Sequence, residues 1–319
     1  MLEDIIVFAL SSSIELADEI CQHLGVARGK CQVKHFADGE IIVEPDESVR
    51  GKNVFIIQST CNPVSETYME VLVALDALKR ASANEVTVVM PYYGYARQDR
   101  KARARQPITA KLMADLLQTA GANRIVTLDL HAPQIQGFFN IPIDDLSAVA
   151  MIGQYFRGKS FEQEVVVVSP DHGGATRARR LADVIPNSSI AIIDKRRTKP
   201  NVAEAMNLIG DVNGKIAIVV DDIVDTAGSL MGGIDMLIRN GAEEVYCACT
   251  HGILSGPAVQ RIRDSQIKEL IVTNSIPLTE EKRQEGKIKQ ISIGYMLAKT
   301  IEAIQNHTPV SVLYDLFNE

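Results

Sequence analysis

The sequence predicts an α/β fold in which mainly parallel β-sheets are flanked by helices. Apolar, β-branched runs alternate with segments of helical period through residue 131, a pattern typical of parallel sheets. Residues 215–230 repeat the order of strand, loop and helix in the second half of the chain. Of the 319 residues, 46% are apolar and 23% are charged, the composition of a globular protein with room for about two domains.

The first half opens with a strand at residues 4–10 and a helix that starts after Ser13, a residue favoured at helix N-termini. Gly25 ends this helix. Further apolar runs predict strands at residues 54–58, 85–93 and 124–131. Between them we expect a helix near Ile108, introduced by Pro107, and a helix over 65–82 whose buried face carries Tyr68, Met69, Leu72 and Val73.

The second half has the same kinds of element. Helical spacing predicts helices over residues 146–157, 176–185 and 257–264 and in the tail, and apolar runs predict strands at residues 164–169, 190–193, 244–250 and 269–273. Residues 153–160 match the phosphate-loop pattern GxxxxGK[ST]. We reject this match because a phosphate loop follows a strand and precedes a helix, and here the order is reversed.

We expect two domains, residues 1–145 and 146–319, with the tail over 300–319 packing back on the first domain. The N-terminus has no basic flank, and no apolar run reaches the ~20 residues that span a bilayer. These features predict a cytoplasmic protein without a membrane partner. The five cysteines are odd in number and form no CxxC, so we expect buried thiols rather than disulfides or a zinc site.

The most specific motif lies in residues 215–230, where an apolar strand is expected to end on Asp221 and Asp222. Residues 226–229, Thr-Ala-Gly-Ser, then lead into a helix, whose N-terminus favours an anion. Carboxylates accept hydrogen bonds and suit the vicinal hydroxyls of a ribose. A ribose phosphate is the expected ligand, and the motif resembles that of type I phosphoribosyltransferases. The alternative is a parallel strand whose acidic end caps a helix.

Two basic clusters stand out in a chain of net charge -7: Arg97, Arg100, Lys101, Arg103 and Arg105, and then Lys195, Arg196, Arg197 and Lys199. Such local concentrations indicate a small polyanion rather than nucleic acid, which needs a broad basic face. Solvated basic loops are the alternative. Since the Pro200 ring is the sole apolar group in residues 194–201, we expect this segment to stay mobile until a polyanion binds.

Three further turns carry candidate ligands. An aromatic, two acids and a glycine in residues 35–40 could hold a nucleotide base and its ribose, although such turns are also common in hairpins. Asp129 and His131 end a strand, and His131 is a candidate metal or phosphate contact, with a structural histidine as the commoner case. Residues 170–174, Pro-Asp-His-Gly-Gly, suit a metal and a closely approaching ligand.

Taken together, seven stretches resemble the ribose-phosphate diphosphokinases, a family also called phosphoribosyl pyrophosphate synthetases. They are FADGE (36–40), GYARQDRK (94–101), ITAKL (108–112), DLHAPQIQGFF (129–139), VVSPDHGG (167–174), IDKRR (193–197) and VVDDIVDTAGS (219–229). The resemblance covers nearly the full length. It implies two similar domains of type I phosphoribosyltransferase-like fold, each a mainly parallel sheet flanked by helices, and a homohexamer built from dimers. It also implies transfer of the β,γ-diphosphoryl group of ATP to the 1-hydroxyl of ribose 5-phosphate, which yields 5-phosphoribosyl 1-diphosphate and AMP.

The resemblance further implies the roles of individual residues. ATP is expected to be bound by Phe36, Asp38, Gly39, Glu40, Arg97 and Gln98, and Mg²⁺ by His131 and Asp171. Ribose 5-phosphate is expected to be bound by Arg197, Asp221, Asp222, Asp225, Thr226, Ala227, Gly228 and Ser229. Lys195 and Arg197 are the expected catalytic residues. No general base is evident, so we expect positioning and electrostatics to drive the reaction.

The resemblance also implies regulation, with phosphate as an activator and ADP as an inhibitor. The corresponding residues are Ser48, Arg50, Ser82 and Ser311. Family members often carry Ser-Val-Ser near the C-terminus, whereas this chain has Pro309 before Val310 and Ser311, which removes one hydroxyl and one amide donor. We therefore expect weak phosphate activation. Two alternatives are kept for the chain as a whole: a phosphoribosyltransferase, and a catalytically silent regulatory subunit of the same family.

Overall fold

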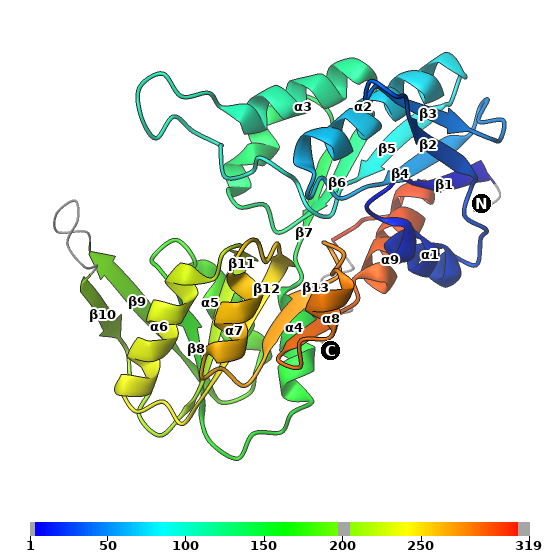
Figure 1. Cartoon of the computed structure of the whole chain (residues 1–319). Coiled ribbons are helices and arrows are strands. Elements are labelled where there is room, and N and C mark those ends of the chain that lie inside the picture. The colour runs from blue at the N-terminus through cyan, green and yellow to red at the C-terminus, as the bar shows by residue number, and fades with distance from the viewer. Residues whose placement is uncertain (1–3, 197–204, 312–319) are drawn as a thin grey trace. The chain divides into compact units, whose positions relative to one another are not determined.

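The computed structural model describes residues 4–196 and 205–311, and the contacts within it divide the chain into two compact units. Unit 1 comprises residues 4–147, Ser275–Pro277 and residues 292–311, and unit 2 comprises residues 148–196, 205–274 and Leu278–Ile291. Each unit is built around its own β-sheet (Figure 1). The predicted α/β class, with mainly parallel sheets flanked by helices, is confirmed in both units.

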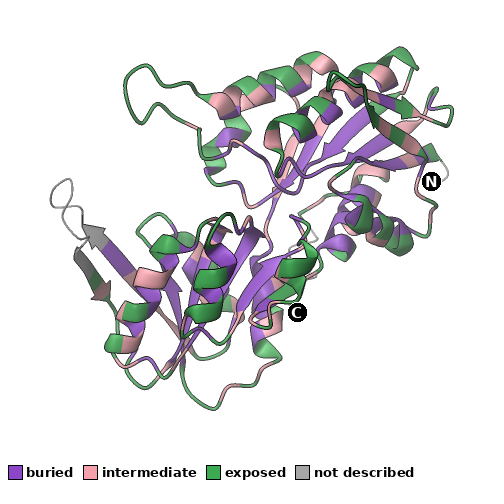
Figure 2. Cartoon of the chain, viewed as in Figure 1, coloured by how far each residue is buried: buried purple, intermediate pink, exposed green. Residues whose placement is uncertain are grey.

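Unit 1 contains a five-stranded parallel sheet in the order β1-β4-β5-β6-β7. Its strands are β1 (Ile5–Ala9), β4 (Asn53–Ile57), β5 (Glu85–Val89), β6 (Arg124–Leu128) and β7 (Ile143–Leu146). Figure 2 shows these strands as mostly buried. An antiparallel hairpin, β2 (Cys31–His35) with β3 (Ile41–Pro45), lies outside this sheet.

Helices cover both faces of the unit 1 sheet (Figure 1). Helices α2 (Val64–Arg80) and α3 (Thr109–Ala120) contribute Leu75 and Leu117 to a core with Phe8 and Ile56. On the other face, α1 (Ile14–Leu24) packs against α9 (Gly294–Gln305), so a segment near the C-terminus belongs to unit 1. The short 3₁₀ helix η2 (Pro133–Phe138) follows β6.

Unit 2 contains a seven-stranded sheet in the order β10-β9-β8-β11-β12-β13-β14, with β10 as its one antiparallel strand. The strands are β8 (Val165–Ser169), β9 (Ser188–Arg196), β10 (Ala205–Ile209), β11 (Ile216–Val224), β12 (Glu244–Gly252), β13 (Leu270–Thr273) and β14 (Ile288–Ile291). The helices are α4 (Val149–Arg157), α5 (Ala175–Val184), α6 (Gly228–Arg239), α7 (Ala258–Asp264) and α8 (Glu280–Arg283). Helices α6 and α7 contribute Ile234 and Ile262 to a buried apolar cluster that also contains Val219 of β11.

Three expectations about elements were wrong in detail. The strand expected to end on Asp221 and Asp222 continues to Val224, because β12 pairs with it that far. We expected residues 194–196 in a loop, but they extend β9. Their backbone pairs with β10, and this pairing does not depend on the type of side chain. Met69, expected on the buried face of α2, is 48% exposed, and the buried face is rotated to include Glu70 and Val71.

Among the described residues, none of the helices combines the length and the apolar character needed to cross a membrane. All five cysteines are described, and none of them forms a disulfide.

Candidate active site

The expected ribose-phosphate motif lies at the point where the order of the unit 2 sheet reverses. From β8 the chain continues to β9 on one side, whereas β11 continues to β12 on the other, so β8 and β11 flank the switch point. Open α/β sheets bind ligands outside the carboxyl ends of strands at such a point. The pairing of β11 with β8 ends at Val219, so Asp221 and Asp222 extend beyond the end of β8.

The loop between β11 and α6 presents backbone amides to this crevice. Its backbone is held by neighbouring elements, because the Ser255 amide donates to the carbonyl of Asp225 (3.0 Å) and Arg261 Nη1 donates to that of Thr226 (2.8 Å). Ala227 adopts the left-handed conformation, with φ 58°, and α6 begins at the next residue. Within the described part of the chain, the amides of residues 226–229 donate to no acceptor. A helix N-terminus of this kind is an anion site.

The two carboxylates beside the loop share one cation that the sequence reading missed. Arg177 Nη1 lies 3.3 Å from Asp221 Oδ1 and 3.4 Å from Asp222 Oδ1. The side chain of Asp221 is 34% exposed and that of Asp222 is 7% exposed. Burial and the neighbouring Asp222 carboxylate raise the pKa of Asp221, and Arg177 opposes that shift. The sequence offered one signal for this contact. Arg177 lies in the first turn of a predicted helix, just ahead of Ala178 and Leu181, which are buried.

The turn after β8 is built on Asp171, a predicted metal ligand. The Gly174 amide donates to Asp171 Oδ1 (2.9 Å), and Ser169 Oγ donates to its carbonyl (2.6 Å), so this exposed residue also organises the turn. A Cβ on Gly174 would lie 2.7 Å from Ser169 Oγ, which explains the glycine. His172 Nε2 lies 3.0 Å from Asp194 Oδ1, a carboxylate on β9.

The residues predicted to bind ATP lie on two loops of unit 1. Phe36, Asp38, Gly39 and Glu40 form the β2–β3 turn, where the Glu40 amide donates to Asp38 Oδ1 (3.1 Å) and Gly39 has φ 93°. The Phe36 ring is 53% exposed, which suits stacking on a base.

On the second loop, Arg97 and Gln98 are both exposed. Gln98 is anchored, because Thr109 Oγ1 at the start of α3 donates to its side-chain oxygen (2.6 Å). His131 is exposed between β6 and η2, following Asp129 with φ 41°.

The donor set for a metal ion is sparse. His131 belongs to unit 1 and Asp171 to unit 2, and among the described residues no three His, Cys, Asp or Glu side chains gather into a metal-binding group. Mg²⁺ is usually held by one or two carboxylates together with substrate phosphates and water. An exposed carboxylate such as Asp171, in the turn after β8, fits that pattern.

The remaining predicted residues are placed unevenly. Lys195 lies on β9, where its backbone pairs with Met206, but its side chain and all of Arg197 lie outside the described residues. The structure brings together two of the predicted regulatory residues, since Arg50 Nη1 donates to Ser82 Oγ (3.1 Å). Ser48 and Ser311 are exposed.

Comparison with known proteins gives one consistent answer. Residues 5–121 match the N-terminal domain of ribose phosphate pyrophosphokinase, and residues 183–315 match the phosphoribosyl synthetase-associated domain. The chain is 58% identical over 308 residues to the ribose-phosphate pyrophosphokinase of Bacillus subtilis (strain 168), covering 97% of this chain and 96% of that protein. It is 56% identical over 309 residues to that of Corynebacterium ammoniagenes, with the same two coverages.

A crystal structure of phosphoribosylpyrophosphate synthetase from Mycobacterium smegmatis is also similar. It matches with a TM-score of 0.90 at 43% identity, covering 95% of this chain and 99% of that one. The likeness therefore includes both units. This chain belongs to the ribose-phosphate pyrophosphokinase family.

Proposed function

We propose that this chain is a ribose-phosphate pyrophosphokinase, an ATP-dependent transferase. It moves the β,γ-diphosphoryl group of ATP to the 1-hydroxyl of ribose 5-phosphate, giving 5-phosphoribosyl 1-diphosphate and AMP. The observation that carries this proposal is the 58% identity over 97% of the chain to a protein of that name. The β11–α6 loop, with acceptor carboxylates beside unsatisfied helix amides, supports the sugar-phosphate half of the assignment.

In this proposal the 5-phosphate binds the amides of residues 226–229, and the ribose hydroxyls bind the carboxylates of Asp221 and Asp222. Asp225 lies at the start of the same loop and is included in the sugar-phosphate site. The anomeric oxygen forms a bond to the β-phosphorus while the bond from that phosphorus to the bridging oxygen of AMP breaks. The proton of the sugar 1-hydroxyl is released to solvent water in the same reaction.

Charge is the main obstacle, because both substrates are anions. We assign Lys195 and Arg197 the role of neutralising negative charge that develops on the transferred group. Mg²⁺, with His131 and Asp171 as its protein contacts, would supply further positive charge to the phosphate oxygens when bound. Phe36, Asp38, Gly39, Glu40, Arg97 and Gln98 are assigned to ATP, with the exposed Phe36 ring stacking on the base.

The proposal extends to regulation and assembly. Phosphate and ADP are proposed effectors at a site that includes Ser48, Arg50, Ser82 and Ser311, supported by the contact between Arg50 and Ser82. A cytoplasmic homohexamer is also proposed. The cytoplasmic location is supported by cysteines that form no disulfides, a state maintained in reducing compartments.

One assay separates this function from its two alternatives. Purified chain is incubated with ATP, Mg²⁺ and ribose 5-phosphate, and AMP and sugar 1-diphosphate are quantified. A synthetase produces the two in equal amounts. A phosphoribosyltransferase produces neither from these substrates, and a silent subunit produces neither at any enzyme concentration. Absence of both products would overturn the proposal.

A further inference from the structure

Arg177 occupies a position that local helix energetics disfavour. It is the third residue of α5 (Ala175–Val184), in the turn where the helix dipole presents partial positive charge. A cation there is destabilised, whereas an anion would be stabilised. The side chain is also 18% exposed, so most of its hydration has been lost. Both costs have to be offset by other contacts.

The offsetting contacts are the two carboxylates of the ribose-phosphate motif. One nitrogen, Nη1, lies 3.3 Å from Asp221 Oδ1 and 3.4 Å from Asp222 Oδ1. Asp221 Oδ1 also accepts the backbone amide of Asp222 (2.9 Å), which fixes that carboxylate from a second direction. A carboxylate has about four acceptor positions, so these contacts leave Asp221 able to accept a hydroxyl.

The packing of α5 fixes the backbone that carries Arg177. Ala178 and Leu181 are buried against the sheet, and Leu181 lies one turn after Arg177 on the same face of the helix. The turn before the helix is also closely packed, because a Cβ built on Gly174 would lie 2.7 Å from Ser169 Oγ. Arg177 therefore starts from a fixed position beside the sheet.

We propose that Arg177 is a positioning residue for ribose 5-phosphate, which keeps Asp221 and Asp222 aligned for the ribose hydroxyls and favours their ionised forms. This inference rests on the proposed function. Two adjacent carboxylates would otherwise repel each other and repel a dianionic sugar phosphate. One half-buried cation between them removes part of that repulsion while leaving the carboxylates as acceptors.

The charged and titratable groups that face Asp221 in the described residues come from three elements. Asp222 is its neighbour on β11, Arg177 reaches it from α5, and Cys249 is its register partner on β12. Burial and Asp222 raise the pKa of Asp221, while Arg177 lowers it. Removing the guanidinium should therefore favour protonation of the carboxylates.

The test compares Arg177→Gln, Arg177→Lys and Arg180→Gln with the unmodified chain. Arg180 lies on the same helix and is exposed, so its variant is the matched control. Ribose 5-phosphate binding is measured by calorimetry without ATP, and steady-state kinetics are measured across pH. Arg177→Gln should weaken ribose 5-phosphate binding by about tenfold to a hundredfold. The KM for ATP should change far less.

The pH profile distinguishes positioning from simple structural support. In Arg177→Gln, the acid limb of kcat/KM for ribose 5-phosphate should move to higher pH by about one unit. Arg177→Lys keeps the charge without the planar fork, so it should recover part of the affinity and the original limb. Adding Asp222→Asn to Arg177→Gln should cost less than the sum of the two single changes.

Two results would overturn the inference. One is an Arg177→Gln variant that binds ribose 5-phosphate within about twofold of the unmodified chain. The other is an Arg177→Lys variant that loses binding as Gln does, with no shift of the acid limb in either. If Arg177→Gln fails to fold, the inference is judged by the ribose 5-phosphate binding and the pH profile of Arg177→Lys. Because calorimetry needs no turnover, failure of the synthetase assay would reject the proposed function while leaving the binding measurements of this test intact.

Discussion

At the residue scale, the local chemistry explains which groups can react and which cannot. Cys247 and Cys249 are fully buried on β12, and burial raises the pKa of both thiols. Burial also raises the pKa of Cys21 and of Cys31 to about 11. Thiolates are the reactive form, so these residues should be inert in the folded protein.

We therefore expect alkylation of the native chain at pH 8 to spare Cys247 and Cys249 and to label both after denaturation. Peptide mass spectrometry measures the labelling of each site.

The raised thiol pKa values also determine how the stability of the fold depends on pH. Above about pH 9, unfolded thiols lose protons that the folded thiols keep, so the free energy of unfolding should fall as the pH rises. Rapid labelling of Cys249 in the native chain would contradict the prediction that this thiol is inert, and stability that rises above pH 9 would contradict the predicted dependence on pH.

A second residue-scale prediction concerns Lys195, which lies outside the side chains that the structure describes. Lys195→Ala should lower kcat by an amount equivalent to about 2.7–4 kcal/mol of transition-state stabilisation. Steady-state kinetics measure this, with Lys289→Ala at an exposed position of β14 as the control. Near-normal kcat with raised KM values alone would show that Lys195 binds substrate without assisting the reaction.

The sequence could predict where the two carboxylates and the loop after them lie, but it could not predict that Arg177 lies beside them. The sequence predicted Asp221, Asp222 and residues 226–229 as one motif, because a strand, two acids and small polar residues lie together along the chain. Arg177 lies 44 residues from Asp221, so only the fold brings them together. Helical spacing placed Arg177 on α5 but gave no reason to connect it with β11.

At the element scale, pairing partners rather than side-chain patterns set the strand ends. β11 extends to Val224 because β12 continues beside it, and β9 includes Lys195 and Arg196 because β10 pairs with their backbone. Backbone hydrogen bonds do not depend on apolar side chains, so a charged run gave no strand signal.

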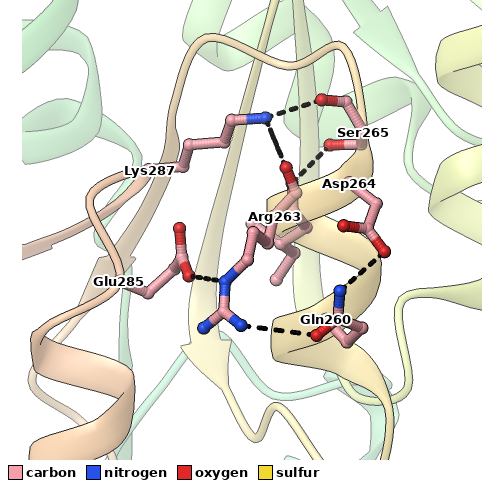
Figure 3. Close-up of polar contacts among 7 residues, drawn as sticks. Gln260, Arg263, Asp264, Ser265, Glu285 and Lys287 are labelled. Atoms are coloured by element: carbon pink, nitrogen blue, oxygen red, sulfur yellow. Dashed lines mark hydrogen bonds and ion pairs between the residues drawn. The ribbon is translucent and has the colours of Figure 1, made fainter.

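Helix α7 shows how a long-range contact ends a short helix (Figure 3). Lys287 Nζ donates to the carbonyl oxygen of Arg263 (2.9 Å), in the last turn of α7, and to that of Ser265 (2.6 Å), the residue after the helix. Arg263 Nε in turn contacts Glu285 Oε2 at 2.8 Å. A cation at a helix C-terminus satisfies unpaired carbonyls and complements the dipole.

Lys287→Met should therefore lower the free energy of unfolding by about 1–2 kcal/mol, because it leaves carbonyls at the end of α7 without their donor. Urea unfolding measures the change, and Lys289→Met, two residues on and exposed, is the matched control. Equal stability of both variants would mean that water replaces the ammonium without cost.

At the scale of the whole molecule, the family match extends over both units and nearly the full length. The sequence predicted the two sheets because their apolar runs are long and β-branched. It could not predict the exact membership of each unit, since Ser275–Pro277 and residues 292–311 return to unit 1 after unit 2 has been built.

Regulation is the whole-molecule property for which the sequence departs from the pattern expected of the family. With Pro309 in place of a serine, one hydroxyl and one amide donor are missing from the expected phosphate site. Titrating phosphate at fixed Mg²⁺ should therefore give weak activation. A strong phosphate requirement would show that Ser48, Arg50 and Ser82 suffice without the C-terminal donor.

The assignment of ribose 5-phosphate to the β11–α6 loop and its two carboxylates can be tested by a crystal structure of the chain with this ligand. We expect the 5-phosphate on the amides of residues 226–229 and the ribose hydroxyls against Asp221 and Asp222. A sugar phosphate bound elsewhere, with no contact to that loop or to those carboxylates, would show that the assignment is wrong.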